Sequence, residues 1–122
     1  MSHVHQHTVL VVEDESLIRM DTAESLREAG FAVVEATDSA EALEAVEKHD
    51  DIGLMFTDIH MPGGMDGLEL AHYVRANHPQ IHLILTSGAR TLRPEEIPHR
   101  GAFFRKPYST DAVAQTMWRL LA

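Results

Sequence analysis

Five short apolar runs recur along the chain, and longer stretches separate them. The first and the fourth are nearly continuous in aliphatic residues rather than alternating, which is typical of strands covered on both faces. The runs are Thr8–Val12, Phe31–Ala36, Ile52–Thr57, Ile81–Thr86 and Ala102–Phe104. Most of the stretches between them have helical spacing, so the sequence predicts a repeated strand–helix unit. With 122 residues, the chain can form one such domain without a disulfide or a structural metal.

Helix start signals lie in the intervening stretches. Two acidic pairs have the spacing of an acidic variant of the capping box: Asp38 with Glu41, and Asp66 with Glu69. A serine can cap the start of the last helix. That serine is Ser109, and the inward residues of its helix are predicted to be Val113, Met117 and Leu120 or Leu121.

The first helix is predicted from an apolar repeat every three residues. Its members are Leu17, Met20, Ala23, Leu26 and Ala29. Gly30 follows directly and supplies a left-handed stop.

The segment between the fourth and fifth runs departs from this pattern. It holds two prolines four residues apart within residues 91–98. Pro94 can begin a helix, but Pro98 would end that helix after one turn. We therefore expect the fourth helix to be short or disordered.

Repeated strand–helix units with right-handed crossovers give an open parallel sheet with helices on both faces. The sequence predicts the α/β class, a flavodoxin-like three-layer α/β/α sandwich with strand order 2-1-3-4-5. Residues 8–122 are expected to form this one domain, and residues 1–7 a disordered N-terminal segment. In this order, ligands bind beyond the carboxyl ends of the first and third strands, where strand order reverses.

Composition excludes several classes of function. The chain has no cysteine, which removes thiol nucleophiles, cysteine zinc sites and disulfide frameworks. Nineteen acids against ten bases give a net charge of −9, which opposes binding to nucleic acid or to an anionic membrane. No apolar run approaches the length of a membrane span, and the N-terminus lacks the regions of a signal peptide. We expect a cytoplasmic protein.

Acidic residues end the first and third runs. Glu13 and Asp14 follow the first run, and Asp58 follows the third. At about 5 Å and an effective dielectric of about 20, each ionised pair costs roughly 3 kcal/mol, so the cluster should bind a cation or raise a pKa. Oxygen ligands with room for water and phosphate oxygens suit Mg²⁺. The sequence therefore predicts a magnesium site here.

A lysine and hydroxyl groups follow the last two strands. Lys106 and Pro107 come after the fifth run, and the Thr86-Ser87-Gly88 sequence closes the fourth. An ammonium and a hydroxyl opposite a magnesium site suit the oxygens of a phosphoryl group. Since no cysteine is present and no serine has a histidine base at a recognisable spacing, Asp58 is the best candidate nucleophile.

These residues carry a family resemblance. Four motifs occur in order: Val-Leu-Val-Val-Glu-Asp-Glu at 9–15, Asp-Ile-His-Met-Pro-Gly-Gly-Met-Asp-Gly at 58–67, Leu-Thr-Ser-Gly at 85–88 and Phe-Phe-Arg-Lys-Pro-Tyr at 103–108. Together they resemble the receiver domain of bacterial two-component response regulators, a single-domain CheY-like chain, over nearly the whole length.

The resemblance implies a role for each matching position. Glu13 and Asp14 would hold Mg²⁺, directly or through water, and Asp58 would be the phospho-acceptor. The backbone carbonyl of His60 would be the third protein ligand of the ion. Lys106 would pair with Asp58 or its phosphate, and the Lys106-Pro107 bond would be cis.

The family's hydroxyl position fits either Thr86 or Ser87. The extra glycine at Gly63-Gly64 shifts the match by one residue, which favours Ser87. Adjacent strand residues point to opposite faces, so only one of the two can face the phosphate. The family's switch aromatic, three residues before the lysine, is Phe103.

The resemblance implies a stand-alone receiver that takes a phosphoryl group from a histidine kinase or phosphotransfer protein in a phosphorelay. It would act on a protein target through the surface of the fourth helix, fifth strand and fifth helix. We expect a monomer that turns over no small molecule. The broken fourth helix puts the usual output face in doubt.

Two alternatives stay open at this stage. The first is a phosphatase or phosphotransferase, whose relatives with such a site generally carry a second acid two residues after the nucleophile; this chain has His60 there. The second is an interaction module that works without phosphorylation. A separate possibility is transition-metal capture by the N-terminal histidines His3, His5 and His7.

Overall fold

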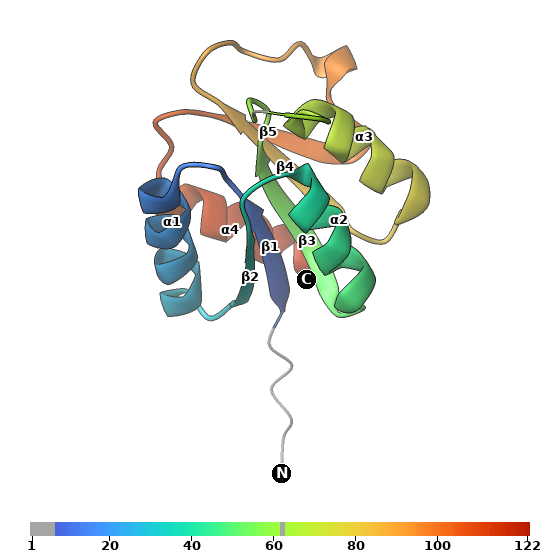
Figure 1. Ribbon diagram of the computed structural model, residues 1–122. Coiled ribbons are helices and arrows are strands. Elements are labelled where there is room, and N and C mark those ends of the chain that lie inside the picture. Colours follow the sequence, from blue (N-terminus) through green and yellow to red (C-terminus); the bar gives the residue numbers. More distant parts are fainter. Residues whose placement is uncertain (1–6, 62) are drawn as a thin grey trace.

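The computed structural model describes residues 7–61 and 63–122. Five parallel strands form one sheet in the order β2-β1-β3-β4-β5, which confirms the predicted topology (Figure 1). The strands are β1 (Thr8–Val12), β2 (Ala32–Ala36), β3 (Ile52–Asp58), β4 (His82–Ser87) and β5 (Gly101–Arg105). The helices are α1 (Ser16–Glu28), α2 (Ser39–Lys48), α3 (Gly67–Asn77) and α4 (Thr110–Leu121). Each strand lies within two residues of its predicted bounds.

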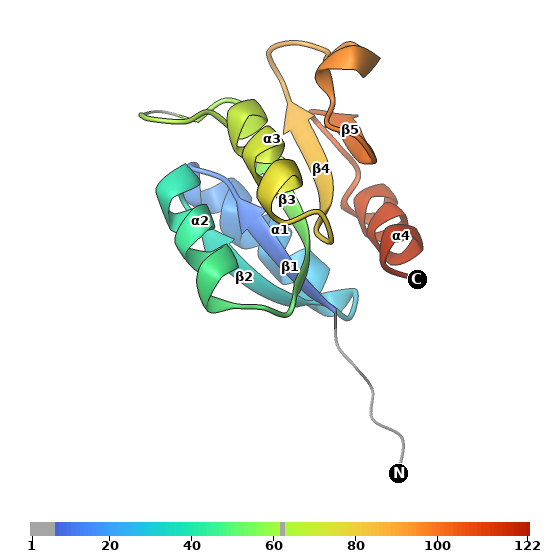
Figure 2. The same cartoon turned by 90° about the vertical axis from the view of Figure 1, so that its right-hand side faces the viewer.

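Helices cover both faces of the sheet, as the three-layer prediction requires (Figures 1 and 2). One buried cluster joins α2 and α3 to the sheet through residues such as Leu10, Met55 and Leu70. A second cluster on the opposite face joins α1 and α4 through residues such as Leu26 and Met117. Alternate residues of the strands enter opposite clusters, so both faces of the central strands β1, β3 and β4 are buried, while the edge strands β2 and β5 are partly buried.

The predicted helix caps are present. The Asp38 carboxylate accepts a hydrogen bond from the Glu41 N–H at 2.8 Å. A complete capping box opens α3, because Asp66 and Glu69 each accept from the other's backbone N–H. The hydroxyl of Ser109 accepts from the Ala112 N–H and begins α4. Local side chains therefore fix where three of the helices start.

The apolar repeat predicted for α1 does not form one buried stripe. Ala23 and Leu26 are buried, but Leu17 and Met20 are 83% and 57% exposed. A repeat of three residues falls short of the helical turn of 3.6, so it turns steadily around the helix and leaves the core face. Gly30 ends the segment in the left-handed region at φ 104°, as predicted.

The connection from β4 to β5 contains a single turn of 3-10 helix, η1 (Pro94–Glu96). This confirms the prediction of a short fourth helix. Pro94 occupies the start of η1 and Pro98 follows it closely. The C-terminal helix, labelled α4, is therefore the fifth helix of the predicted pattern.

The N-terminal prediction concerns mostly residues outside the described ones. Residues 1–6, including His3 and His5, lie outside them. The carbonyl of His7 accepts a hydrogen bond from the Ala32 N–H, and the His7 ring lies edge-on to Trp118. Among the helices of residues 7–61 and 63–122, none combines the length and the apolar character that a bilayer crossing requires.

Candidate functional site

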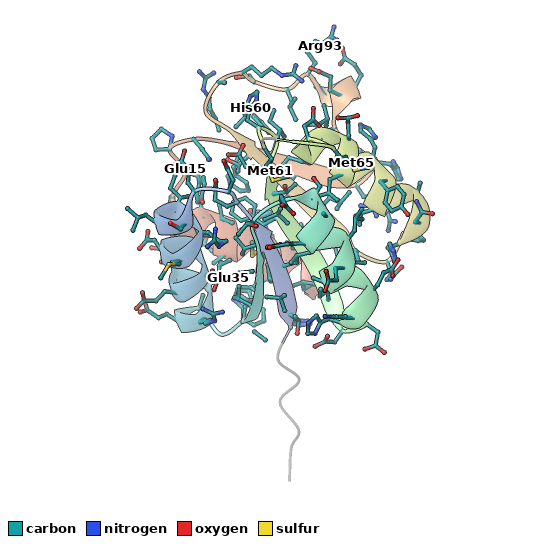
Figure 3. All side chains as sticks on the ribbon, viewed as in Figure 1. Glu15, Glu35, His60, Met61, Met65 and Arg93 are labelled. Atoms are coloured by element: carbon teal, nitrogen blue, oxygen red, sulfur yellow. The ribbon has the colours of Figure 1, made fainter. Side chains whose placement is uncertain are left out.

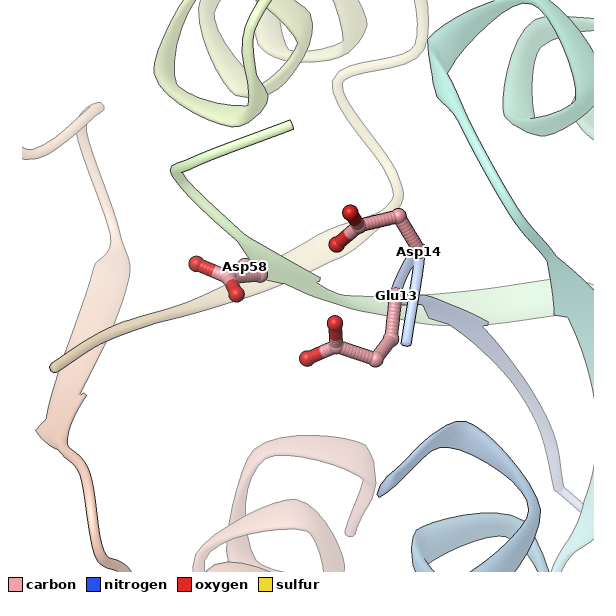
Figure 4. Close-up of side chains that lie close together, drawn as sticks. All are labelled: Glu13, Asp14 and Asp58. Atoms are coloured by element: carbon pink, nitrogen blue, oxygen red, sulfur yellow. The ribbon is translucent and has the colours of Figure 1, made fainter. Parts of the chain in front are cut away.

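Three carboxylates gather at the carboxyl ends of two neighbouring strands. Asp58 ends β3, while Glu13 and Asp14 directly follow β1, which lies beside β3. One oxygen of each carboxylate lies within 4.8 Å of the others (Figure 4). Glu13 and Asp58 are buried and Asp14 is exposed. The structure thus brings together the three acids that the sequence predicted to meet.

Lys106 enters this cluster from the end of β5. Its Nζ donates to Asp58 Oδ2 at 2.7 Å and to Glu13 Oε1 at 3.0 Å. Burial by itself would lower the pKa of Lys106, but the hydrogen bonds to Asp58 and Glu13 outweigh it and raise the pKa above its ordinary value. The lysine therefore stays charged and offsets part of the repulsion between the acids.

Glu13 occupies the most enclosed position of the cluster. Burial raises its pKa, while the hydrogen bond from the Glu15 N–H and the contacts with Lys106 act in the opposite direction. Arg19 of α1 donates through Nη1 to the Glu13 carbonyl at 3.0 Å and forms an ion pair with Glu35. These contacts hold the backbone at the point where Glu13 and Asp14 leave β1.

The backbone around Asp58 is fixed from two sides. The His60 N–H donates to Asp58 Oδ1 at 3.0 Å, and the Ile59 N–H donates to the Thr86 carbonyl. The start of α3 packs onto the same backbone: a Cβ added to Gly67 would lie 1.8 Å from the Asp58 carbonyl oxygen. The loop after β3 therefore needs a glycine at this position.

Thr86 and Ser87 differ in the way that the alternation of a strand requires. Ser87 follows Leu83 and Leu85 toward the α2/α3 cluster, whereas Thr86 is the register partner of Asp58. The fully buried Ser87 hydroxyl accepts from the N–H groups of Ala89 and Arg90, both at 3.2 Å. The Thr86 hydroxyl is buried and has no hydrogen-bond partner among residues 7–61 and 63–122.

Phe103 lies on the same face of the sheet as Ser87. It packs, partly buried, against the α2/α3 cluster, and the next residue, Phe104, packs against the opposite cluster. The register pairs Phe103 with Leu85, two residues before Ser87. The predicted hydroxyl and aromatic positions are therefore neighbours on one face. The Lys106-Pro107 bond is cis, as predicted.

Comparison with known proteins identifies the family to which this chain belongs. A family model described as the response regulator receiver domain matches residues 9–115. The chain is a receiver domain of this family.

Two curated relatives show how widely the domain occurs. The sensor kinase CckA of Brucella abortus is 36% identical over 121 residues, which cover 93% of this chain and 12% of that protein. The transcriptional regulatory protein PdtaR of Mycobacterium tuberculosis is 38% identical over 104 residues, covering 83% of this chain and 50% of that protein. This receiver domain thus spans half or less of the length of these relatives.

Solved structures agree with the assignment. The receiver domain of the hybrid histidine kinase CckA has a TM-score of 0.77 at 31% identity, covering 94% of this chain and 99% of that one. The response regulator protein TrrA of Thermotoga maritima, solved in complex with Mg²⁺ and beryllofluoride, has a TM-score of 0.83 at 27% identity, covering 94% and 99%. Receiver domains are the phosphoryl-accepting modules of two-component systems, where histidine kinases and downstream targets are their partners.

The donor set of this receiver domain fits a magnesium ion. Its three acids offer only oxygen atoms, and Asp14 keeps the cluster open to water. Mg²⁺ is held in proteins by one or two carboxylates with water and phosphate oxygens completing its shell. Glu13, Asp14 and Asp58 are the residues that would hold it.

The sequence did not reveal two contacts beside the receiver site. One is the Arg19 clamp on the Glu13 carbonyl. The other joins the Tyr108 and Thr22 hydroxyls at 2.8 Å, with the Tyr108 ring edge-on to Phe56. Burial raises the pKa of Tyr108, against the effect of its Thr22 contact. Tyr108 could have been noticed because it directly follows Lys106-Pro107. No local signal predicts its contact with Thr22, which is 86 residues away.

Proposed function

We propose that this receiver domain works as a stand-alone response regulator that accepts a phosphoryl group on Asp58. The observation that carries the proposal is Lys106 Nζ bonded to both buried carboxylates of the acidic cluster, Asp58 and Glu13. A nucleophilic carboxylate, a fixed ammonium and a site for a divalent ion are the parts that phosphoryl transfer needs. We assign the donor to a histidine kinase or phosphotransfer protein.

In this proposal an Asp58 carboxylate oxygen attacks the phosphorus of a phosphohistidine, and the bond from phosphorus to the imidazole nitrogen breaks. Bound Mg²⁺ would neutralise charge on the phosphoryl oxygens, held by Glu13, Asp14 and Asp58 with the backbone carbonyl of His60. The His60 N–H already orients Asp58 through Oδ1. Lys106 then moves its hydrogen bond from the carboxylate to a phosphoryl oxygen.

The change of state would begin at Ser87. Its hydroxyl would turn from the Ala89 and Arg90 N–H groups toward the phosphoryl group, leaving space on the face that Phe103 shares. Phe103 has no phenol, so its inward position breaks no hydrogen bond. A local charge thereby shifts a two-state equilibrium.

We place the target surface on η1, β5 and α4, and expect the protein to act as a monomer in the cytoplasm without turning over a small molecule. The single turn of η1 stands where the predicted pattern has its fourth helix. Light scattering with and without beryllofluoride tests the monomer, since a discrete dimer on activation would contradict it.

Labelling by acetyl phosphate tests the acceptor. We expect Mg²⁺-dependent incorporation of one phosphoryl group, lost in Asp58→Asn and retained in Asp111→Asn, which makes the same chemical change at an exposed position of α4. Lys106→Met should slow incorporation strongly because it removes the fixed ammonium. Labelling that persists in Asp58→Asn would overturn the proposed acceptor.

A further inference from the structure

The cations of this acidic chain are unevenly distributed. Six of its ten lysines and arginines lie between residues 70 and 110, a segment with only two acids. Those two acids are Glu95 and Glu96, and they pair with Arg90 and Arg93. The remaining arginines of the segment have no such partner among the described residues. Two of them, Arg75 and Arg100, lie close together.

Arg75 and Arg100 share one hydrogen-bond acceptor. Arg75 Nη1 donates to the Pro79 carbonyl at 3.0 Å, and Arg100 Nη2 donates to the same oxygen at 2.8 Å. The distance between Arg75 Nη1 and Arg100 Nη2 therefore cannot exceed the combined length of these two hydrogen bonds. Two guanidinium charges at this separation repel each other, and no carboxylate of the described residues is paired with either.

Both side chains are held in place. Arg75 also donates to the carbonyls of His99 and Ile81, while its Nη2 is buried without a hydrogen-bond partner in the described part of the chain. Arg100 is the one described residue other than glycine with a positive φ, at 62°, where the chain turns into β5. Such a conformation costs free energy in a residue with a Cβ. The bond from Arg100 to the Pro79 carbonyl places its guanidinium beside that of Arg75.

The positive charges of Arg75 and Arg100 also act on His82. His82 begins β4 and is half-buried. Its pKa is lowered by burial first, then by the charges of Arg100 and Arg75. The lowered pKa favours the neutral form of the His82 ring, so the ring can report on the potential set by the two arginines.

We propose that the Arg75–Arg100 pair is an oxyanion site that takes a carboxylate or phosphate group. Arg100 is exposed, and its bond to Pro79 is the one that it donates to the residues the structure describes, so it would contact the anion directly in the planar, forked geometry that suits carboxylate and phosphate. Arg75, tied to three carbonyls, would contribute the second fixed charge. The pair lies at the amino ends of β4 and β5, the end of the sheet opposite Asp58, so the site is independent of the phosphoryl acceptor.

The anion could be a free ion or an acidic side chain of a partner protein. Inorganic phosphate and a short glutamate-rich peptide are the two probes, each titrated into the isotopically labelled protein at constant ionic strength. We expect saturable shifts of the His82 ring and Gly101 amide signals in NMR spectra. Saturation by phosphate identifies a free-ion site, and saturation by the peptide alone identifies a contact for an acidic protein segment.

Two variants and one control make the test specific. Arg100→Gln should weaken binding about tenfold, as expected for a charge-assisted hydrogen bond. Arg100→Gly should weaken it equally while relieving the positive φ, so lost binding would not reflect lost stability. Arg105→Gln removes an exposed arginine from the other end of β5 and should leave binding unchanged. The absence of saturable shifts with both probes, or equal weakening in all three variants, would overturn the proposal.

Discussion

Two connections border the proposed phosphoryl site, and they are built in opposite ways. The connection from β3 to α3 is closed by backbone packing, with Gly67 against Asp58 and a complete capping box at Asp66. The connection from β4 to β5 has one turn of 3-10 helix, held by the Arg90 side chain and the Arg93 N–H, which both donate to the Glu96 carboxylate. The first resists change because backbone atoms touch, whereas the second depends on a few polar contacts.

This difference indicates where a local charge can change the surface. The Ser87 hydroxyl holds the Ala89 and Arg90 N–H groups, and the Arg90 side chain in turn bonds to Glu96. Arg93 carries a second link to the same carboxylate, and it lies with His60 toward the end of the molecule where the strands finish (Figure 3). A hydroxyl that leaves its two N–H groups would therefore loosen the second connection and leave the first intact.

The largest expected difference between the two connections comes from adding one carbon, a Cβ, to a glycine in each. Gly67→Ala should destabilise the protein by about 3 kcal/mol or more, because the new Cβ would overlap the Asp58 backbone and neither element can yield cheaply. Gly88→Ala is the matched change in the second connection, where the nearest atom is Lys106 Cβ at 3.5 Å. It should change stability by less than about 0.5 kcal/mol. Urea unfolding measures both, and equal losses would contradict the contrast.

A smaller effect is expected at the cap of α3. Asp66→Ala should cost about 1 kcal/mol because the Glu69 N–H loses its acceptor and the capping box is broken. Asp66→Asn keeps an acceptor at the N-cap and should cost much less. Thermal unfolding of the two variants gives the comparison. A loss as large in Asn as in Ala would show that charge rather than capping supports this end of the helix.

The contrast between the two connections also explains what the sequence could predict. Signals within a few residues, such as the Asp66–Glu69 box or Pro94 with Pro98, correctly predicted the starts of α2, α3 and the C-terminal helix and the short η1. The alternation of β4 placed Ser87, rather than Thr86, on the face of Phe103. All three acids and the lysine were found because parallel strands end at one edge.

Contacts between distant segments carry no such signal. The Arg19 bond to the Glu13 carbonyl and the shared acceptor of Arg75 and Arg100 depend on how elements pack, not on spacing along the chain. The exposure of Leu17 also depends on packing. A repeat of three residues predicts a helix, but it does not determine which face of the helix packs against the sheet.

The smallest and most local prediction concerns pH and Glu96. Hydrogen bonds from the Arg93 N–H first, and then from the Arg90 side chain, lower the pKa of Glu96 from 4.5 to about 2. Because the folded state binds this proton more weakly than the unfolded state, the contribution of Glu96 is complete above about pH 4.5 and is lost as pH falls toward 2. The Arg93 and Ile97 amide signals of the folded protein should shift with a midpoint near pH 2, where the folded-state carboxyl titrates.

Glu96→Gln is the matched variant, because it keeps the size of the side chain and removes its charge. At neutral pH, its Arg93 amide should exchange with solvent faster than in the parent protein, while the amides of α3 keep their protection. A Glu96 carboxyl that titrates near 4.5, or α3 amides that lose protection together with Arg93, would contradict the assignment. The first result would mean that the arginines do not hold the carboxylate, and the second that the two connections open as one unit.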